Sequence, residues 1–359
     1  MNPESIFTSF GTSTTLHYRN LTNREGDKMG RMLKLFLCMC LIMIAAVPIY
    51  GATPTEYMIS NKPEGVFGGQ LVVPHFGNPE TFNPITATEH NTIEALDVVF
   101  DSLVSFDETT STYKPRLAKS WSISEDNRSF VFSIRRGVKF HDGIELTAKD
   151  VKFTFEVVTD PEIKAPFRDK YSLSKDEMIC ELLDDYTLKI TFKEESTDVL
   201  ELFSSLKVIP MHLLEDPWKE GRFNDFWGVN TPLKQIIGTG PYCLNQLKLN
   251  EYITYSKNTN FWMVSPKKKQ LPYITRYVRV FAKDYPDQIL KFLSGQIDIA
   301  YMEKQAYEAH RDKQSKYNFT FFKFEEQNAY IALRNTLKNA QPNPSGPTLH
   351  NIEEVFYVK

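Results

Sequence analysis

The sequence has no large excess of charge of either sign. Its 42 lysines and arginines face 45 aspartates and glutamates, which gives a formal net charge of −3 over 359 residues. Proteins that bind nucleic acid usually show a strongly basic face, so this balance argues against a nucleic-acid partner. The one basic run, Lys267-Lys268-Lys269, lies between Pro266 and Pro272, and we interpret it as a solvated loop.

The sequence also lacks the common catalytic and metal-binding motifs. It contains no Gly-x-Ser-x-Gly, and its seven histidines include no His-Glu-x-x-His spacing. Gly238-Thr239-Gly240 is not followed by the Lys-Ser/Thr pair of a phosphate-binding loop. His141 and Asp142 are adjacent, and neighbouring residues rarely point at one another, so we interpret them as part of a turn. We therefore expect no catalytic residues, no metal site and no cofactor.

Long apolar runs are almost absent as well. Leu35 to Ile49 is an apolar run of fifteen residues that follows Arg31 and Lys34. A membrane-spanning helix needs about 20 such residues, so the run fits a secretory signal peptide better. We predict a signal peptide over residues 29–51, with retention as an anchor as the alternative, and a protein that is periplasmic or extracellular. Residues 1–28 form a doubtful leader to which we assign no fold.

Cysteine is scarce outside this run, which contains Cys38 and Cys40. Only Cys180 and Cys243 follow it. In an exported protein these two could form a disulfide or stay as separate buried thiols. The spacing alone does not decide between the two.

The most informative stretch is residues 129–156. Phe130, Phe132 and Ile134 alternate with more polar residues, which predicts a strand with one buried face. His141-Asp142-Gly143 predicts a turn, and Thr147 with Asp150 three residues later predicts a capped helix. A second helical spacing is carried by Ile93, Leu96, Val99, Phe100 and Leu103.

The same stretch, with Arg136 to Gly143 followed by Leu146 to Val151, resembles the extracellular solute-binding proteins of family 5. These are the dipeptide-, oligopeptide- and nickel-binding receptors of ABC importers. Gly238 to Tyr242 and Gln296 to Ala300 are similar to further landmarks of that family. The resemblance implies an α/β fold of the periplasmic-binding-protein type II, with mixed sheets and two lobes with an inserted subdomain.

The resemblance extends from about Gly69 to about Ala332 and implies a division of the chain into lobes. We predict a discontinuous first lobe, formed by residues 69–98 and 187–281, with an inserted subdomain at residues 99–186. The start of a second lobe follows at residues 282–336, and residues 337–359 form an atypical tail. Because family members are usually longer, we expect an incomplete C-terminal lobe and a truncated chain, with a naturally short variant as the alternative.

A segment rich in proline follows the first predicted strand. Pro79 and Pro84 fix the backbone on either side of it, which suits a stiff loop that faces a ligand and equally suits an ordinary crossover. We place candidate ligand contacts in this segment and at one aromatic residue, although a position in the core or at an interface explains the aromatic residue better. The candidates are Glu80, Thr81, Phe82, Asn83 and Trp121.

The resemblance implies that the chain captures a peptide, or a related small solute, and delivers it to the membrane permease of an ABC importer. We expect a monomer that makes and breaks no bond. The alternatives are a non-functional fragment of such a receptor and a binder of oligosaccharide or nickel chelate.

Overall fold

The computed structural model divides the chain into two compact units, Met1–Ala52 and Thr53–Lys359. Only the second contains residues that the structure describes. The predicted leader and signal peptide, and most of the tail, lie outside them. The described ranges are 55–107, 110–171, 173–174, 177–195, 199–324, 329–335, 337–338 and 356–357.

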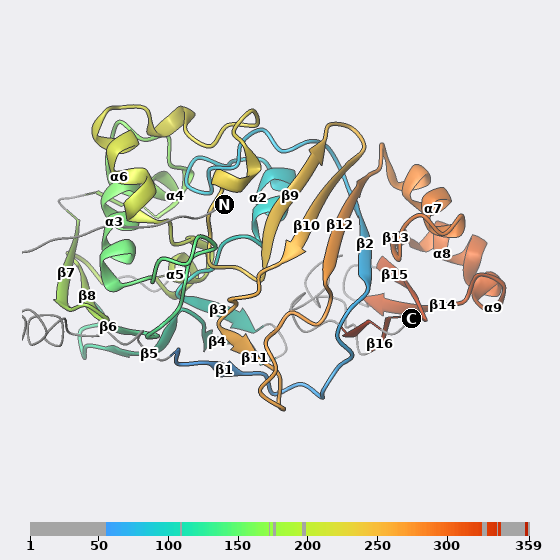
Figure 1. The fold of residues 1–359 in the computed structure, drawn as a ribbon, viewed down its shortest axis with the longest axis horizontal. Coiled ribbons are helices and arrows are strands. Elements are labelled where there is room, and N and C mark those ends of the chain that lie inside the picture. The colour runs from blue at the N-terminus through green and yellow to red at the C-terminus, as the bar shows by residue number, and fades with distance from the viewer. Residues whose placement is uncertain are drawn as a thin grey trace, which may run out of the picture. The chain divides into compact units, whose positions relative to one another are not determined.

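A four-stranded sheet brings together two distant parts of the chain (Figure 1). Its strand order is β2 (Gln70–His75), β12 (Arg276–Phe281), β10 (Tyr252–Lys257) and β9 (Tyr242–Lys248). β2 runs parallel to β12, whereas the other pairs are antiparallel. The sheet is therefore mixed, as predicted for the fold class. The short helix α2 (His90–Leu96) follows β2 in the chain.

A second sheet has the order β5 (Ala118–Ile123), β6 (Ser129–Ile134), β8 (Thr187–Phe192) and β7 (Met178–Asp184). The predicted alternation is confirmed, because Phe130, Phe132 and Ile134 of β6 are all buried. The helix α3 (Ala148–Val158) packs against β7 and β8. The predicted cap is confirmed too: the Thr147 hydroxyl accepts a backbone N–H, and the Asp150 carboxylate accepts the N–H of Thr147.

A third sheet, β13 (Ile299–Glu303), β15 (Ala329–Arg334) and β14 (Phe319–Phe324), is fully antiparallel. The helices α7 (Tyr285–Leu293), α8 (Lys304–His310) and α9 (Gln314–Tyr317) lie beside it (Figure 1). Gly295 ends the turn after α7 with a φ of +84°, as expected for a helix stop.

The remaining elements are short. Three two-stranded sheets pair β1 (Met58–Ile59) with β11 (Met263–Val264), β3 (Val104–Asp107) with β4 (Thr112–Pro115), and β16 (Leu337–Lys338) with β17 (Phe356–Tyr357). The other helices are α4 (Pro166–Lys170), α5 (Val199–Ser205) and α6 (Met211–Lys219), with 3-10 turns at η1 (Phe223–Asp225), η2 (Leu233–Gln235) and η3 (Arg311–Lys313).

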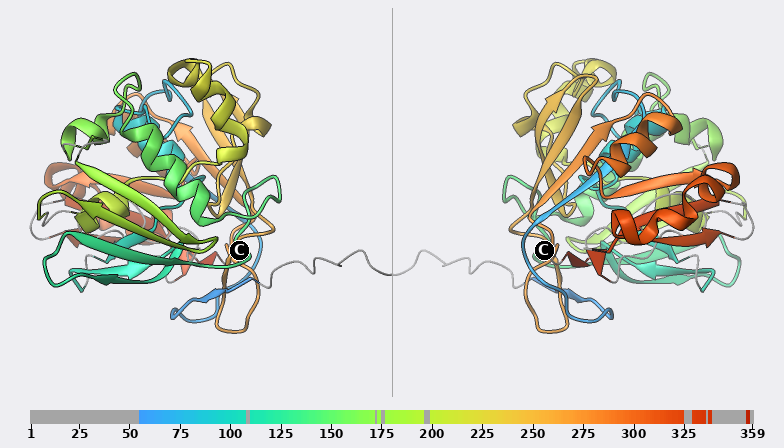
Figure 2. Two further views of the ribbon diagram at one scale, coloured as in Figure 1. Left: turned by 90° about the vertical axis from the view of Figure 1, so that its left-hand side faces the viewer. Right: turned by 90° about the vertical axis from the view of Figure 1, so that its right-hand side faces the viewer.

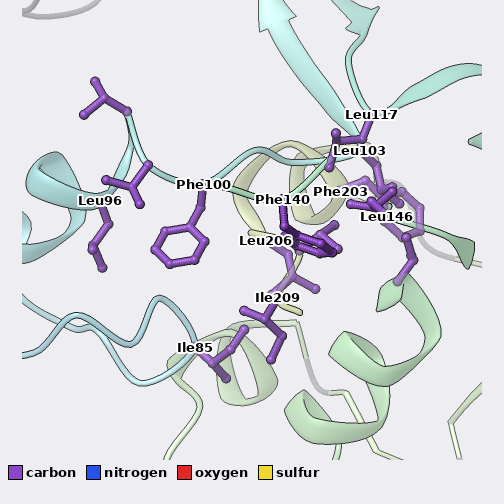
Figure 3. Close-up of a cluster of buried hydrophobic side chains, with 14 of the residues drawn as sticks. Ile85, Leu96, Phe100, Leu103, Leu117, Phe140, Leu146, Phe203, Leu206 and Ile209 are labelled. Carbon is purple, nitrogen blue, oxygen red and sulfur yellow. The ribbon is translucent and has the colours of Figure 1, made fainter. Parts of the chain in front are cut away.

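One large apolar cluster joins the first two sheets. The region in Figure 3 packs side chains from segments that are far apart in the sequence, including Leu96, Phe140 and Phe203. A smaller cluster around Phe292 and Phe319 fills the space between α7 and the third sheet. The contacts of the larger cluster hold the segments of the candidate site in place.

The helix predicted from Ile93 to Leu103 is wrong beyond Leu96. The backbone of Val98 and Val99 leaves the helix and accepts hydrogen bonds from the N–H groups of Tyr242 and Gly240, at 3.0 and 2.9 Å. Tertiary pairing has replaced helical bonds here, and Val99, Phe100 and Leu103 are buried in the core instead. The division into lobes remains a prediction.

No helix within the described ranges has both the length and the apolar character needed to cross a membrane.

Candidate functional site

The proline-rich segment after β2 is held firmly by a second segment at residues 223–228. The N–H of Phe82 donates to the carbonyl of Trp227 at 2.7 Å, and Thr81 forms an antiparallel bridge with Gly228. The Asn83 amide donates to the carbonyl of Phe223 at 3.1 Å. Because each bond fixes a backbone position, the segment presents its exposed residues in a defined place.

The predicted ligand residues of this segment divide into two kinds. Phe82 and Asn83 have no exposed surface, and the Asn83 carboxamide also accepts the N–H of Ile85 at 3.0 Å. In the structure, these two buried residues support the loop. Glu80 is exposed and Thr81 is half-buried. These two side chains are the members of the segment that reach solvent.

Glu80 and Thr81 line a pocket of about 200 Å³. Every residue of its lining has a polar or charged side chain, and these residues come from the loop before α2, from α2 itself, from the loop between α3 and α4 and from η1. The lining residues are Glu80, Thr81, Thr86, Thr88, Glu89, Thr92, Lys164 and Asn224. The pocket therefore offers carboxylates, hydroxyls, one amide and one ammonium group to a solute.

The far wall of the pocket is fixed by hydrogen bonds of its own. The Asn224 amide accepts the N–H of Lys164 at 2.8 Å and donates to the carbonyl of Glu162 at 2.8 Å. On the near wall, the N–H of Glu80 donates to the Thr92 hydroxyl at 3.0 Å. Sequence reasoning missed Glu89, Lys164 and Asn224, because only the folded chain brings them beside Glu80.

Trp121 is not among the residues that line this pocket. It lies on β5 opposite Phe132 of β6, with ring centroids 6.5 Å apart, and it is half-buried against the main core. Its role as a ligand contact therefore remains a prediction that is separate from the pocket.

His141 joins two of the motifs noted in the sequence. Its Nε2 donates to the carbonyl of Gly240 at 3.0 Å, and its Nδ1 accepts the N–H of Gly238 at 3.3 Å. Burial lowers the pKa of His141, partly offset by the bond to Gly240, so the ring is neutral at pH 7. Asp142 contacts His212 instead, at 2.7 Å. His141 and Asp142 therefore do not form a catalytic pair in which the acid orients the base, which agrees with the interpretation of this segment as a turn.

A buried network links three further motifs behind the site. The Asp101 carboxylate accepts bonds from Arg116 at 2.6 Å, from the indole N–H of Trp262 at 2.8 Å and from the hydroxyl of Thr239 at 3.2 Å. The Arg116 guanidinium also lies over the Trp262 ring, 5.2 Å from its centroid. Asp101 is only 2% exposed, so this network is structural.

The thiols offer little chemistry. Cys180 and Cys243 are both free and lie on strands of different sheets. Burial raises the pKa of Cys180 to about 12 and that of Cys243 to about 11, which keeps both protonated and unreactive at neutral pH. Within the described ranges, no three or more His, Cys, Asp or Glu side chains gather as metal ligands.

Comparison with known proteins identifies the family. The model for the middle part of the bacterial extracellular solute-binding proteins, family 5, matches residues 112–352. The chain belongs to this family. Family 5 members are solute-binding proteins, and the family is named for its extracellular members. The family match confirms the resemblance that the motifs predicted.

Curated relatives of the chain carry consistent names. A probable ABC transporter-binding protein of Deinococcus radiodurans is 26% identical over 279 residues, which cover 75% of this chain and 46% of the relative. A putative ABC transporter peptide-binding protein of Brucella ovis is 29% identical over 260 residues, covering 72% and 45%. The chain thus spans about half the length of these relatives.

A solved structure of similar fold supports the predicted fold class. The oligopeptide-binding protein AppA of Bacillus subtilis, in complex with a nonapeptide, is 23% identical with a TM-score of 0.61. The similarity covers 72% of this chain and 48% of AppA. The chain therefore has the type II periplasmic-binding-protein fold, as predicted.

Proposed function

We propose that the chain is the substrate-binding protein of an ABC importer and captures peptides outside the cytoplasmic membrane. Membership of family 5 and the names of the curated relatives support this proposal. The observation that carries it is the polar pocket at Glu80 and Thr81, which the stiff loop after β2 helps to build.

The pocket suits recognition of a peptide without any covalent step. Glu80 and Glu89 provide two carboxylates for an ammonium group or a basic side chain, and Lys164 provides one partner for a carboxylate. The threonine hydroxyls and the Asn224 amide match the donors and acceptors of a peptide backbone. A few converging polar groups are what fixes a ligand's orientation in such sites.

The buried residues of the segment have a supporting role in this proposal. Phe82 anchors the loop in the core, and Asn83 ties it to the 223–226 turn. Trp121 is proposed as a contact outside the pocket. The proposed cargo passes to a membrane permease, and we expect the binding protein to act as a monomer without a cofactor.

The test is a thermal-shift and calorimetric screen of the chain with peptides, oligosaccharides and nickel–histidine. A ligand that binds only the folded state raises stability as RT ln(1 + [L]/Kd), so the melting temperature should rise with peptide concentration. A shift with sugar or nickel chelate alone would replace peptide by that solute. No shift with any solute, beside a clear shift for full-length AppA, would overturn the proposal.

Two variants test the pocket. Glu80→Gln and Glu89→Gln should each weaken peptide binding by about tenfold or more, because a charge-assisted bond contributes about 1.5–3 kcal/mol. Glu125→Gln, an exposed carboxylate in the turn between β5 and β6, is the matched control and should bind peptide normally. Equal binding by all three variants would remove these carboxylates from the site.

A further inference from the structure

An exposed ribbon at the start of the described chain combines apolar and basic side chains. β1 pairs in parallel with β11, with Met58 opposite Met263 and Ile59 opposite Val264. The loop after β11 carries the three lysines noted in the sequence. We use the name lysine ribbon for the exposed residues in and next to β1 and in the loop after β11: Tyr57, Ile59, Lys267, Lys268 and Lys269.

The apolar members of the lysine ribbon are not covered by the protein. Tyr57 is 48% exposed and Ile59 is 53% exposed, whereas Met58 between them packs against the main core. The two exposed side chains line a groove of about 530 Å³ together with Val264, Lys268 and Gln270. An exposed apolar groove with a polar rim marks an interaction surface.

The charge around this groove is positive. All three lysines are exposed. Beside them, the Glu64 carboxylate accepts bonds from the Ser265 hydroxyl and the N–H of Lys267, both at 3.1 Å. Glu56, next to Tyr57 in the chain, is paired with the Lys119 ammonium group at 2.9 Å. The three lysine charges therefore outnumber the single charge of Glu64, and the surface suits an anionic partner.

The sequence connects this surface to a segment that is suited to lipid. Ile49, the end of the fifteen-residue apolar run, is eight residues before Tyr57. Eight residues reach at most about 28 Å when fully extended. Whenever the apolar run is in a bilayer, the lysine ribbon is thus confined to within that distance of the lipid surface. Figure 2 shows β1, in blue, beside the orange hairpin that carries the lysines.

We propose that the lysine ribbon docks on an anionic phospholipid bilayer. Tyr57 and Ile59 enter the boundary between head groups and acyl chains, and the lysines remain at the level of the lipid phosphates. The attraction between lysines and anionic lipid falls within a Debye length, about 8 Å at physiological salt, so it acts only when the surfaces are close. This contact does not depend on solute binding.

The test places a polarity-sensitive fluorophore on the ribbon of the full chain. Ile59→Cys is labelled in a background with Cys38→Ser and Cys40→Ser. Leu290→Cys, 67% exposed on α7, is the matched control site. With vesicles of phosphatidylcholine and phosphatidylglycerol, emission at residue 59 should shift to shorter wavelength, and emission at residue 290 should not. The shift should be lost in 1 M salt.

Charge variants distinguish membrane binding by the lysine ribbon from membrane binding by the leader, which has basic residues of its own. Replacing Lys267, Lys268 and Lys269 by glutamine should abolish the shift at residue 59. Replacing the exposed Lys304, Lys313 and Lys316 by glutamine makes the same change in net charge and should leave it intact.

Three results would overturn the proposal. One is a shift at residue 59 that survives the ribbon substitution, or that neutral vesicles give equally, because the leader alone would then explain it. Another is an equal shift at residue 290. The third is a shift without vesicles that grows with protein concentration, which would assign the ribbon to contact between copies of the chain.

Discussion

His141 Nε2 donates a hydrogen bond to the carbonyl oxygen of Gly240 at 3.0 Å, across almost a hundred residues of sequence. The same ring accepts the N–H of Gly238, and the N–H of His141 donates to the carbonyl of Gly238 at 2.9 Å. One half-buried imidazole therefore joins the turn after β6 to the turn before β9. Several testable consequences depend on how tightly these turns are packed.

Replacing His141 by alanine should destabilise the fold. The N–H of Gly238 loses the acceptor of its hydrogen bond in a buried site, which costs about 1–3 kcal/mol in the free energy of unfolding. Asn258 still donates to the Gly240 carbonyl at 2.9 Å, which limits the loss there. Urea denaturation measures the effect. His212→Ala, which breaks a partly exposed pair with Asp142 and an edge contact with the Phe140 ring, is the control and should cost about 1 kcal/mol or less.

The pH dependence of stability should also reflect His141. Its pKa is lowered by burial in the folded chain, so below pH 6.5 this histidine is protonated in the unfolded chain while it stays neutral in the folded chain. The free energy of unfolding therefore falls as pH drops from about 6.5 toward the folded-state pKa, by up to about 1.4 kcal/mol per pH unit. His75, also buried and with a lowered pKa, adds in the same direction.

The measurement compares His141→Gln with the unmodified chain by urea denaturation at pH 7.5, 6.5 and 5.5. The variant should lose less stability on acidification, since one histidine with a lowered pKa is gone. If the free energy of unfolding fell equally with pH for the two proteins, His141 would be protonated equally easily in the folded and unfolded chains, which would contradict the prediction.

Gly240→Ala should be strongly destabilising for a steric reason. A Cβ at this position would lie 2.6 Å from the carbonyl oxygen of Val98, and backbone atoms cannot move aside cheaply. We expect a loss of about 2–4 kcal/mol, typical of severe overpacking, from chemical denaturation. In Gly228→Ala the nearest atom is 3.7 Å away, so that variant should lose less than about 1 kcal/mol. Similar losses for both would mean that the close approach is relaxed in solution.

Asp101→Ala should remove the centre of the buried network. Arg116 would keep its charge without its carboxylate, and the indole N–H of Trp262 would lose its acceptor. Breaking a buried ion pair from one side costs about 3–5 kcal/mol. Thermal and urea unfolding measure it. Glu156→Ala, which breaks an exposed pair with Lys152, should cost about 1 kcal/mol or less, and a comparable loss there would contradict the assignment.

Local patterns predicted much of the fold correctly. The alternation in β6, the capping box before α3 and the glycine after α7 all depend on residues within a few positions of one another. The helix predicted to Leu103 failed because Gly240 and Tyr242 compete for the carbonyls of Val99 and Val98. That competition comes from residues more than 140 positions away, which periodicity cannot detect.

The candidate site was predicted only in part, and for a similar reason. A proline-bounded loop after a strand indicated Glu80 to Asn83, but not which of these side chains reach solvent. The core and the 223–228 segment decide that Phe82 and Asn83 turn inward. They also place Lys164 and Asn224 opposite Glu80, although no local signal links these positions.

Residue types at short, fixed spacings were enough to indicate the family, the local strands and caps, and the absence of common catalytic motifs. The folded chain was needed to show which side chains share a pocket, which histidines have a lowered pKa and where the lysine loop lies. These properties depend on contacts between distant segments, and burial and hydrogen bonding assign them only once the chain has folded.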